Sequence, residues 1–294
     1  MPSISVIVPT YNSSTTIVET INSVYKQCFL GRIQLVIVDD CSADILTLEE
    51  KITTSQPPSN VEIKFIKLRN NMGGGSARNT GIQASNCDYL TFLDSDDIWM
   101  QHKLTCQLRS YKDGTILTSQ VMKGANFDNS KVLPLEVKQS NEKVSDALFV
   151  NNKLIQTSTF FMSSDIAKSI MFNPKLPRHQ DYDFLLRAES LGYPVIQTEE
   201  PTSFWRVENC SSNRFLKKKA TPEFFIEWYK EYKKYMTNRA NIAYVAKNIF
   251  SACIITKKFG LFFKFLLSEN FSYSERIKIV KAILLWRWEK LKNE

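Results

Sequence analysis

The sequence predicts an α/β protein in which helices flank a mostly parallel sheet and a helical appendage follows at the C-terminus. Three observations lead to this prediction. Apolar segments of strand length alternate with segments of helical periodicity through the first hundred residues. Polar side chains follow three of these strands, as expected where parallel strands end at one edge of a sheet. Residues 220–294 carry helical patterns throughout.

The alternation is regular in the first third of the chain. Strand patterns lie at 3–8, 34–38, 61–68 and 89–93, and helical patterns follow the first two at 17–24 and 45–54. Strands connected through helices form right-handed crossovers, which produce parallel pairing. Later the pattern is less regular: it predicts strands at 115–121 and 154–162, with a polar loop over 124–143 between them.

The fourth strand pattern ends in three carboxylates within four residues, Asp94, Asp96 and Asp97. Neighbouring carboxylates repel one another unless a cation or hydrogen-bond donors neutralise them. A divalent metal shared with a phosphate would do so, because hard cations prefer oxygen ligands. A solvated turn that caps the helix predicted to begin near Gln101 explains the residues equally well, since Asp and Ser are common cap residues.

Two further strand ends favour the ligand site. Residues 9–12 and 39–40 are also polar, and three such ends at one sheet edge predict a nucleotide crevice. The glycine-rich turn at 71–81 matches neither a Walker loop nor a dinucleotide fingerprint. It is either a helix start that needs close packing or a phosphate-binding turn, in which the guanidinium of Arg78 could reach the ligand.

The composition excludes several classes of protein. The six cysteines are scattered without a Cys-x-x-Cys pair, which favours reduced thiols and speaks against a structural zinc site of that type. We expect neither a signal peptide nor a membrane-spanning helix, because no apolar run is long enough for either. The net charge is +8, and the excess of Lys and Arg is concentrated beyond residue 214.

The basic C-terminal region is also rich in aromatic residues. It is either a helical subdomain or an amphipathic surface that binds an anionic membrane leaflet. Nucleic acid is a weaker alternative because no recognition motif accompanies the charge. We therefore divide the chain into 1–215, which carries the α/β pattern, and 216–294, a basic, aromatic-rich helical region.

A second acidic pair, Asp181 and Asp183, stands at the start of a predicted helix. Acids in a first turn are favoured by the helix dipole. Residues two apart cannot share one helix face, so one of the two can face a cleft while the other has a structural partner. We expect Asp183 to be the structural one.

With these residues in view, the first ~210 positions resemble the inverting family 2 glycosyltransferases of GT-A fold, a Rossmann-like architecture. Five segments carry the resemblance: Val-Ile-Val-Pro-Thr-Tyr-Asn at 6–12, Val-Ile-Val-Asp-Asp-Cys-Ser at 36–42, Asn-x-Gly-x-x-x-Ala-Arg-Asn-x-Gly at 71–81, Leu-Asp-Ser-Asp-Asp at 93–97 and Gln-Asp-Tyr-Asp-Phe-Leu-Leu-Arg at 180–187. Bacterial enzymes of surface polysaccharide synthesis (O-antigen, capsule, exopolysaccharide) are the most similar members.

The resemblance implies a role for each matching position, and the residues fall into three groups. The nucleotide-binding group is Pro9, Thr10, Tyr11, Asp40 with Asp39 beside it, Arg78, Asp94 and Ser95. Asp96 would bind Mg²⁺ or Mn²⁺, assisted by Asp94. Asp181 would be the catalytic base, because inversion in one displacement requires removal of the acceptor's proton. His179 is an alternative base that we rank below Asp181.

The sequence departs from the family pattern at two positions. Gln180 replaces a glutamate that often precedes the base, and Glu208 stands near the position where many members carry a metal-binding histidine. Glu208 could be an oxygen ligand of the metal, or the third ligand could be absent.

The function expected from the resemblance is transfer of a sugar from a nucleotide-sugar, with UDP as the first candidate nucleotide. The acceptor would be a polyprenyl-linked saccharide or an oligosaccharide, at the cytoplasmic face of the membrane, in the synthesis of lipopolysaccharide or capsule. Two alternatives are a sugar-1-phosphate nucleotidyltransferase, which the Pro-Thr-Tyr-Asn loop disfavours, and a non-catalytic nucleotide-sugar-binding scaffold.

Overall fold

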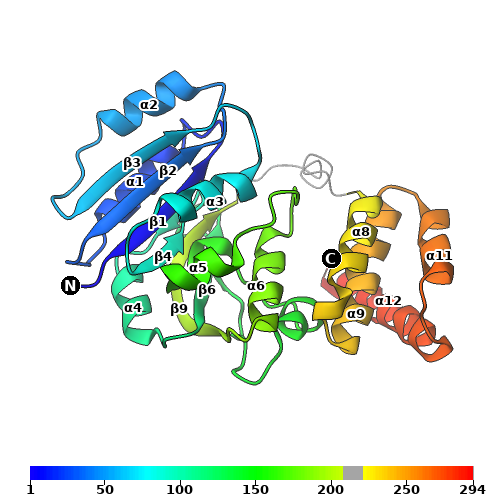
Figure 1. The fold of residues 1–294 in the computed structure, drawn as a ribbon. Coiled ribbons are helices and arrows are strands. Elements are labelled where there is room, and N and C mark those ends of the chain that lie inside the picture. The colour runs from blue at the N-terminus through cyan, green and yellow to red at the C-terminus, as the bar shows by residue number, and fades with distance from the viewer. Residues whose placement is uncertain (208–220, 294) are drawn as a thin grey trace. The chain divides into compact units, whose positions relative to one another are not determined.

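The computed structural model describes residues 1–207 and 221–293 (Figure 1). Within this range the chain forms two compact units, 1–140 with 153–207 and 141–152 with 221–293. The predicted division at 215 falls among residues outside the described part. Residues 141–152 were predicted to belong to the first domain, whereas their contacts are with the second unit.

The first unit is built on one sheet whose strand order is β3-β2-β1-β4-β8-β6-β9-β5, with β7 paired to β6. The strands are β1 (Ile4–Thr10), β2 (Ile33–Asp39), β3 (Val61–Lys67), β4 (Tyr89–Phe92), β5 (Ile98–Trp99), β6 (Ile116–Gly124), β7 (Ser130–Leu133), β8 (Phe161–Ser163) and β9 (Val195–Arg206). The first four are parallel to one another, and beyond β4 the pairing is mixed.

Helices cover both faces of this sheet. They are α1 (Ile17–Tyr25), α2 (Ile45–Thr53), α3 (Gly74–Ala84), α4 (Lys103–Ser110), α5 (Ser164–Ile170) and α6 (Gln180–Ser190). The right-handed crossovers β1-α1-β2 and β2-α2-β3 place α1 and α2 on one face, and the return to β4 places α3 on the other. The predicted α/β class is confirmed.

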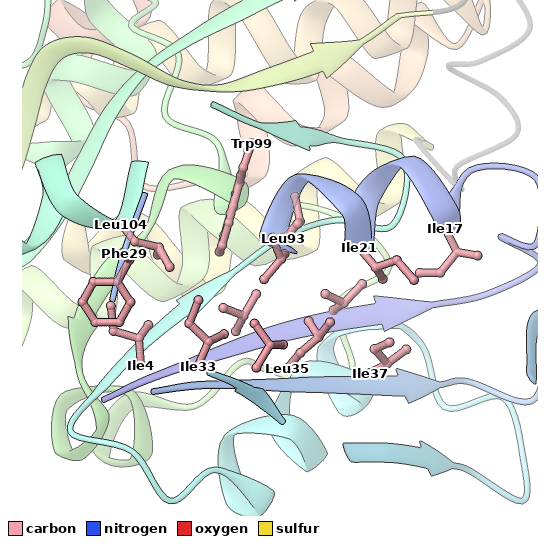
Figure 2. Packing of buried hydrophobic residues seen from close by; sticks show 14 of the residues in the cluster. Ile4, Ile17, Ile21, Phe29, Ile33, Leu35, Ile37, Leu93, Trp99 and Leu104 are labelled. Atoms are coloured by element: carbon pink, nitrogen blue, oxygen red, sulfur yellow. The ribbon is translucent and has the colours of Figure 1, made fainter. Parts of the chain in front are cut away.

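A core of aliphatic side chains explains why the strands form where they do. Every residue of β2 is buried, as expected for a parallel strand covered on both faces. Ile17 and Ile21 of α1 pack on β1 and β2 beside Leu93 (Figure 2). On the other face α3 lies so close to β1 that a Cβ at Gly81 would stand 2.4 Å from Ile7 Cγ2. A glycine is therefore required there.

The second unit is helical, as predicted for the part that the structure describes. Its helices are α8 (Pro222–Tyr232), α9 (Asn238–Tyr244), α10 (Phe250–Ile255), α11 (Phe259–Ser268) and α12 (Tyr273–Asn293), with a π-helical turn, Val245–Ile249, between α9 and α10. The ring of Trp228 stacks on Tyr232 and Tyr244 at centroid distances of 4.6 and 4.9 Å. Phe149 from the 141–152 segment packs against Tyr244 in the same cluster.

Two secondary-structure predictions are only partly right. The strand predicted at 154–162 is confirmed only at its end, in the short strand β8, and a 3-10 turn, Thr157–Thr159, precedes it. The reason is a set of tertiary hydrogen bonds: Ser158 Oγ donates to Asp97 Oδ2, and the Trp99 indole donates to the Ser158 carbonyl. The predicted loop at 124–143 contains β7, which sequence periodicity alone did not reveal.

Candidate active site

The ends of β1 and β2 are joined by their side chains. Thr10 and Asp39 are paired in register, and Thr10 Oγ1 lies 3.3 Å from Asp39 Oδ1. The Asp39 carboxylate also accepts from Ser42 N at 2.9 Å and from Ser42 Oγ at 2.5 Å. Pro9 belongs to β1 itself, whereas the side chain of Tyr11 just beyond it is exposed. The Tyr11 side chain therefore lies at the surface, while Thr10 and Asp39 fix the backbone that precedes it.

Asp40 fixes the glycine-rich turn. Its two oxygens accept hydrogen bonds from Met72 N and Gly73 N, each at 2.7 Å. Gly73 has a φ of +84°, a conformation that favours glycine, and it directly precedes α3. The predicted contact of Asp40 with a nucleotide base stays a prediction. What the structure establishes is that Asp40 orients the start of the helix that carries Arg78.

The acidic turn after β4 is held against α1 by hydroxyl groups. Thr16 Oγ1 and Thr20 Oγ1 both donate to the Ser95 carbonyl, at 2.7 and 2.9 Å. Ser95 Oγ and Ser13 Oγ lie 2.8 Å apart. The turn is thereby fixed next to the β1–α1 loop, and the three polar strand ends lie on adjacent strands, as predicted.

The three acids of this turn differ in environment. Asp94 is partly buried, Asp96 is exposed and Asp97 is fully buried. Asp97 accepts from Gln156 Nε2 and Ser158 Oγ, each at 2.6 Å, and its Oδ1 has no hydrogen-bond partner among the described residues. Burial raises the pKa of Asp97 well above its usual value, and the charges of Asp94 and Asp96 raise it further. The suggested cap role of this turn is wrong, because α4 begins at Lys103 after His102.

Arg78 joins the acidic turn to the start of α6. Its Nη2 donates to Asp94 Oδ1 at 2.5 Å and its Nη1 donates to Gln180 Oε1 at 2.7 Å. The guanidinium also lies over the Phe172 ring, 5.4 Å from its centroid. Its side chain is only 11% exposed, so the charge pair with Asp94 is partly shielded from solvent. Arg78 thus connects a strand end to the helix that carries the predicted base.

Gln180 is suited to this position because its amide both accepts and donates. While Oε1 accepts from Arg78, Nε2 donates to the Leu176 carbonyl at 2.6 Å. An ionised glutamate has no donor for Leu176 and would add a negative charge beside Asp181. The departure from the family pattern therefore has a structural reason that the sequence did not reveal.

Asp181, the predicted base, has a pKa raised to about 6. Desolvation is the largest cause; a hydrogen bond from Tyr182 N and the charge of Arg78 oppose it. His179 adopts a left-handed conformation, and its ring packs edge-on against Tyr182 at 4.7 Å. Burial and the charge of Arg178 hold the pKa of His179 well below its usual value. A carboxylate titrating near 6 is a more effective base at neutral pH than this imidazole.

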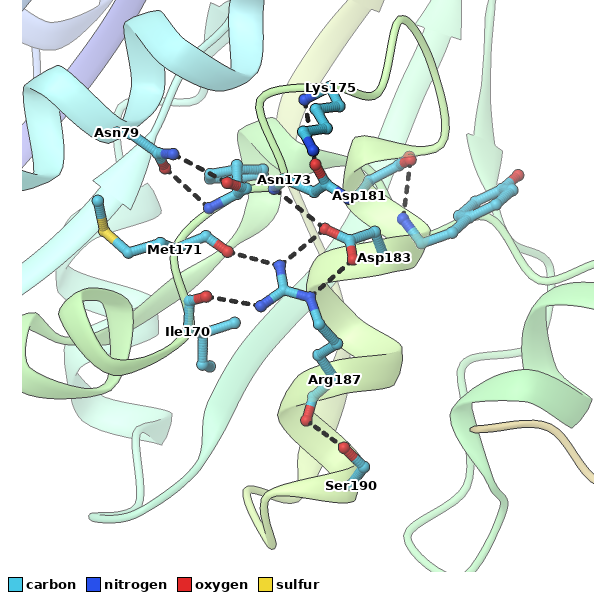
Figure 3. Close-up of polar contacts among 11 residues, drawn as sticks. Asn79, Ile170, Met171, Asn173, Lys175, Asp181, Asp183, Arg187 and Ser190 are labelled. Carbon is cyan, nitrogen blue, oxygen red and sulfur yellow. Dashed lines mark hydrogen bonds and ion pairs between the residues drawn. The ribbon is translucent and has the colours of Figure 1, made fainter. Parts of the chain in front are cut away.

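Asp183 has the structural role expected for it (Figure 3). It is completely buried, and its two oxygens pair with Nε and Nη2 of Arg187, each at 2.7 Å. Arg187 in turn donates to the carbonyls of Ile170 at 2.6 Å and Met171 at 2.5 Å. This network fixes the loop between α5 and α6, and with it the first turn of α6.

The residues at the strand ends suit a hard divalent cation. Three carboxylates lie within residues 94–97, and Arg78 pairs with one of them, Asp94. The pKa of Asp97 is raised first by burial and then by the charges of Asp94 and Asp96. Mg²⁺ and Mn²⁺ typically need only one or two protein carboxylates when a phosphate completes the shell. Asp96 and Asp94 can supply these oxygens. Glu208, the third predicted ligand, lies outside the described residues.

The hydroxyl and amide side chains that support the site were not predicted from the sequence. Thr16, Thr20, Gln156 and Ser158 position the acidic turn, although none stands in a recognisable motif. Thr16 and Thr20 are spaced by one helical turn, and this is the one signal that could have indicated a shared partner.

Strands β2 and β3 are added on one side of β1 and β4 on its other side, so the strand order reverses at β1. Such a reversal, with carboxylates and a guanidinium at the strand ends, is typical of a nucleotide-binding α/β enzyme. The glycosyl transferase family 2 model matches residues 5–170. The amylovoran biosynthesis glycosyltransferase AmsB of Erwinia amylovora is 31% identical over 251 residues, which cover 83% of this chain and 82% of AmsB. The chain therefore belongs to glycosyl transferase family 2 and is a glycosyltransferase. Membership decides against the nucleotidyltransferase alternative.

Solved structures with a similar fold support the GT-A assignment. TarS 1–349 of S. aureus in complex with UDP-GlcNAc is 20% identical, with a TM-score of 0.60, and the match covers 95% of this chain and 79% of TarS. The mannosyltransferase PcManGT of Pyrobaculum calidifontis in complex with GDP-Man and Mn²⁺ is 13% identical, with a TM-score of 0.61, over 98% of this chain and 88% of that one.

The Asp183–Arg187 network predicts a large loss of stability when one partner is removed. Arg187→Gln leaves the buried Asp183 charge without its partner and should lower the free energy of unfolding by about 3 to 5 kcal/mol, measured by urea denaturation.

The matched control is Arg32→Gln, which breaks the exposed pair of Arg32 with Glu62. We expect that substitution to change the free energy of unfolding far less than Arg187→Gln does, because water and salt screen an exposed ion pair. Equal effects of the two substitutions would show that the buried network does not support the fold.

Proposed function

We propose that the chain transfers a sugar, with inversion, from a UDP-sugar to a hydroxyl of a lipid-linked saccharide in bacterial surface polysaccharide synthesis. The observation that carries the proposal is the position of Arg78 between Asp94 and Gln180, next to Asp181. This position brings the Arg78 guanidinium, which can bind a phosphate, close to the Asp181 carboxylate, which can accept a hydroxyl proton. The 31% identity to a glycosyltransferase of amylovoran biosynthesis supports a polysaccharide product.

The donor nucleotide is the first specific part of the proposal. Similar folds are found with UDP-GlcNAc and with GDP-Man, so the fold does not select the base. We assign UDP as the donor nucleotide from the resemblance of the chain to the family as a whole. In this proposal Pro9, Thr10 and Tyr11 line the nucleoside pocket, and Asp39 and Asp40 stand at the base edge. Asp94 and Ser95 lie at the ribose and phosphates.

The proposed reaction requires little covalent chemistry from the protein. Asp181 accepts the proton of the acceptor hydroxyl as its oxygen attacks the anomeric carbon from the face opposite the leaving nucleotide. Arg78 neutralises charge on the departing diphosphate, and the low exposure of its side chain strengthens this interaction. Mg²⁺ or Mn²⁺, held by Asp96 with Asp94, would supply a Lewis acid for the same charge.

A panel of UDP- and GDP-sugars tests the donor assignment. We expect calorimetry with Mn²⁺ present to detect UDP binding, and turnover of one UDP-sugar to release UDP. Asp96→Ala should weaken nucleotide binding in Mn²⁺ and remove its dependence on the metal. Binding of GDP in preference to UDP would refute the donor assignment, and unchanged binding in Asp96→Ala would refute the metal site.

The pKa of Asp181 predicts the pH dependence of activity. The base acts in its ionised form, so kcat/KM should be half-maximal near the pKa of about 6, become level roughly one pH unit above it, and fall about tenfold per pH unit well below it. Asp181→Asn should lower kcat by about 10² to 10⁴-fold and abolish this acidic limb.

Asp113→Asn is the control, because it removes an exposed carboxylate of the same unit. It should leave both kcat and the pH profile unchanged. Retention of the acidic limb in Asp181→Asn would assign the base to another group.

We also propose that the second unit binds the inner face of the cytoplasmic membrane. No helix within residues 1–207 and 221–293 is long and apolar enough to span a bilayer. However, α12 buries Ile279 and Ile283 on one side and exposes Val280, Leu284 and Trp288 on another. A helix that is apolar on both sides needs a second apolar environment. Lys278, Lys281 and Arg287 alternate with the exposed residues, which favours anionic lipid.

Vesicle co-sedimentation tests this contact. The full chain should bind vesicles that contain phosphatidylglycerol and bind neutral vesicles weakly, with the difference reduced by salt. Leu284→Glu should abolish binding, whereas Leu46→Glu, at a similarly exposed position of α2, should not.

Two results would contradict the membrane assignment. One is the absence of sedimentation with anionic vesicles. The other is a dimer that Leu284→Glu dissociates, which would assign the surface to a second copy of the chain.

A further inference from the structure

A second group of metal-ligating side chains lies in the first unit, outside the site already described. His102 directly precedes α4, and Cys106 follows four residues later, so both stand on the same face of its first turn. Glu200 comes from β9, far away in the sequence. One donor atom from each side chain, an imidazole nitrogen, a thiol sulfur and a carboxylate oxygen, lies within 4.8 Å of the other two.

The backbone explains why Glu200 reaches α4. In the pairing of β6 with β9, Ser119 is opposite Thr198 and Gln120 is opposite Pro201, so two extra residues bulge from β9. Bulges redirect side chains and are over-represented at functional sites. Met100 N also donates to the Thr202 carbonyl at 2.9 Å, which fixes the approach to α4 against β9.

Two buried side chains fix the rotation of α4 about its axis. Leu104 and Lys103 are completely buried, and Lys103 Nζ lies 4.6 Å from the centroid of the Trp99 ring. Their burial keeps His102 and Cys106 on the side that faces Glu200. The three side chains are partly exposed, so an ion from solvent can reach them.

The polar atoms of the cluster are incompletely satisfied. His102 Nε2 is shielded from solvent and makes no hydrogen bond among the described residues, although Glu200 Oε1 lies 3.4 Å away. A neutral imidazole nitrogen and a carboxylate both present lone pairs, so a cation or a proton must lie between them. Adjacent ligands of a tetrahedral zinc ion are about 3.3 to 3.8 Å apart, as Zn–N, Zn–O and Zn–S distances of about 2.0 to 2.3 Å require.

We propose that His102, Cys106 and Glu200 form a Zn²⁺ site that ties the first turn of α4 to the bulge of β9. A thiolate with an imidazole selects zinc over the magnesium or manganese of the strand-end site. Three protein ligands leave one position for water. Binding replaces the S–H bond of Cys106 with a Zn–S bond, and the released proton passes to the buffer.

Arg109 has a secondary part in this site. Its Nη2 lies 3.9 Å from Cys106 Sγ. Burial and the neighbouring Glu200 raise the pKa of Cys106, and the charge of Arg109 partly opposes them. The site is independent of the proposed donor and acceptor, so its test does not depend on the transferase assignment.

The first experiment measures metal binding by the chelator-treated full chain in excess Mg²⁺. We expect one equivalent of Zn²⁺ by competition with a chromogenic chelator, and a rise in Tm on binding, because a ligand of the native state stabilises it. Co²⁺ should give a sulfur-to-cobalt charge-transfer band in the near ultraviolet, together with the visible spectrum of a tetrahedral ion.

Variants then locate the ion. Cys106→Ser should abolish the charge-transfer band and weaken Zn²⁺ binding by more than tenfold, and His102→Ala and Glu200→Gln should each weaken it. Cys41→Ser, which removes another exposed thiol, should retain both signals, and so should Asp96→Ala. A folded chain that binds no Zn²⁺, or a charge-transfer band that persists in Cys106→Ser, would overturn the proposal and leave a protonated His102 paired with Glu200.

Discussion

The arrangement of the first unit depends on the interaction of Arg78 with Asp94 and Gln180. The Arg78 guanidinium neutralises Asp94, which follows β4, and donates a second hydrogen bond to Gln180, the first residue of α6. The position of Arg78 depends on α3, the helix that carries it. Asp40 holds the turn that begins α3, and Gly81 allows α3 to lie close to β1. Removal of Arg78 would therefore separate the strand-end carboxylates from the helix that carries Asp181 and leave Asp94 without its cation.

The rest of the site is a set of short polar connections around that guanidinium. Hydroxyls of α1 hold the Ser95 carbonyl, and the Asp183–Arg187 pair holds the loop before α6. Each connection joins segments that are distant in the sequence, so the polar strand ends are rigid before any ligand arrives. Such preorganisation is what a transfer reaction dominated by electrostatics and positioning requires.

The sequence predicted the elements whose signals are local. The buried parallel strands, the polar groups at their ends and the structural role of Asp183 all follow from periodicity, burial and helix geometry. The strand expected at 154–162 is shortened to β8, because Ser158 in the preceding turn donates to the buried Asp97, a contact that no local pattern encodes. From the sequence Gln180 was only a departure from the family pattern, since its two partners, Arg78 and Leu176, are not indicated by any motif. The packing of 141–152 with the second unit could not be predicted either, because it depends on contacts with residues far away in the sequence.

We propose that the strand ends around Arg78 bind the nucleotide-sugar while Asp181 faces the acceptor. The most direct measurement is a crystal structure of the full chain with UDP and Mn²⁺. We expect the diphosphate beside Arg78, the metal on Asp96, and the uridine against the loop that carries Thr10 and Tyr11. A nucleotide bound away from these strand ends, or a diphosphate that contacts neither Arg78 nor the metal on Asp96, would contradict it.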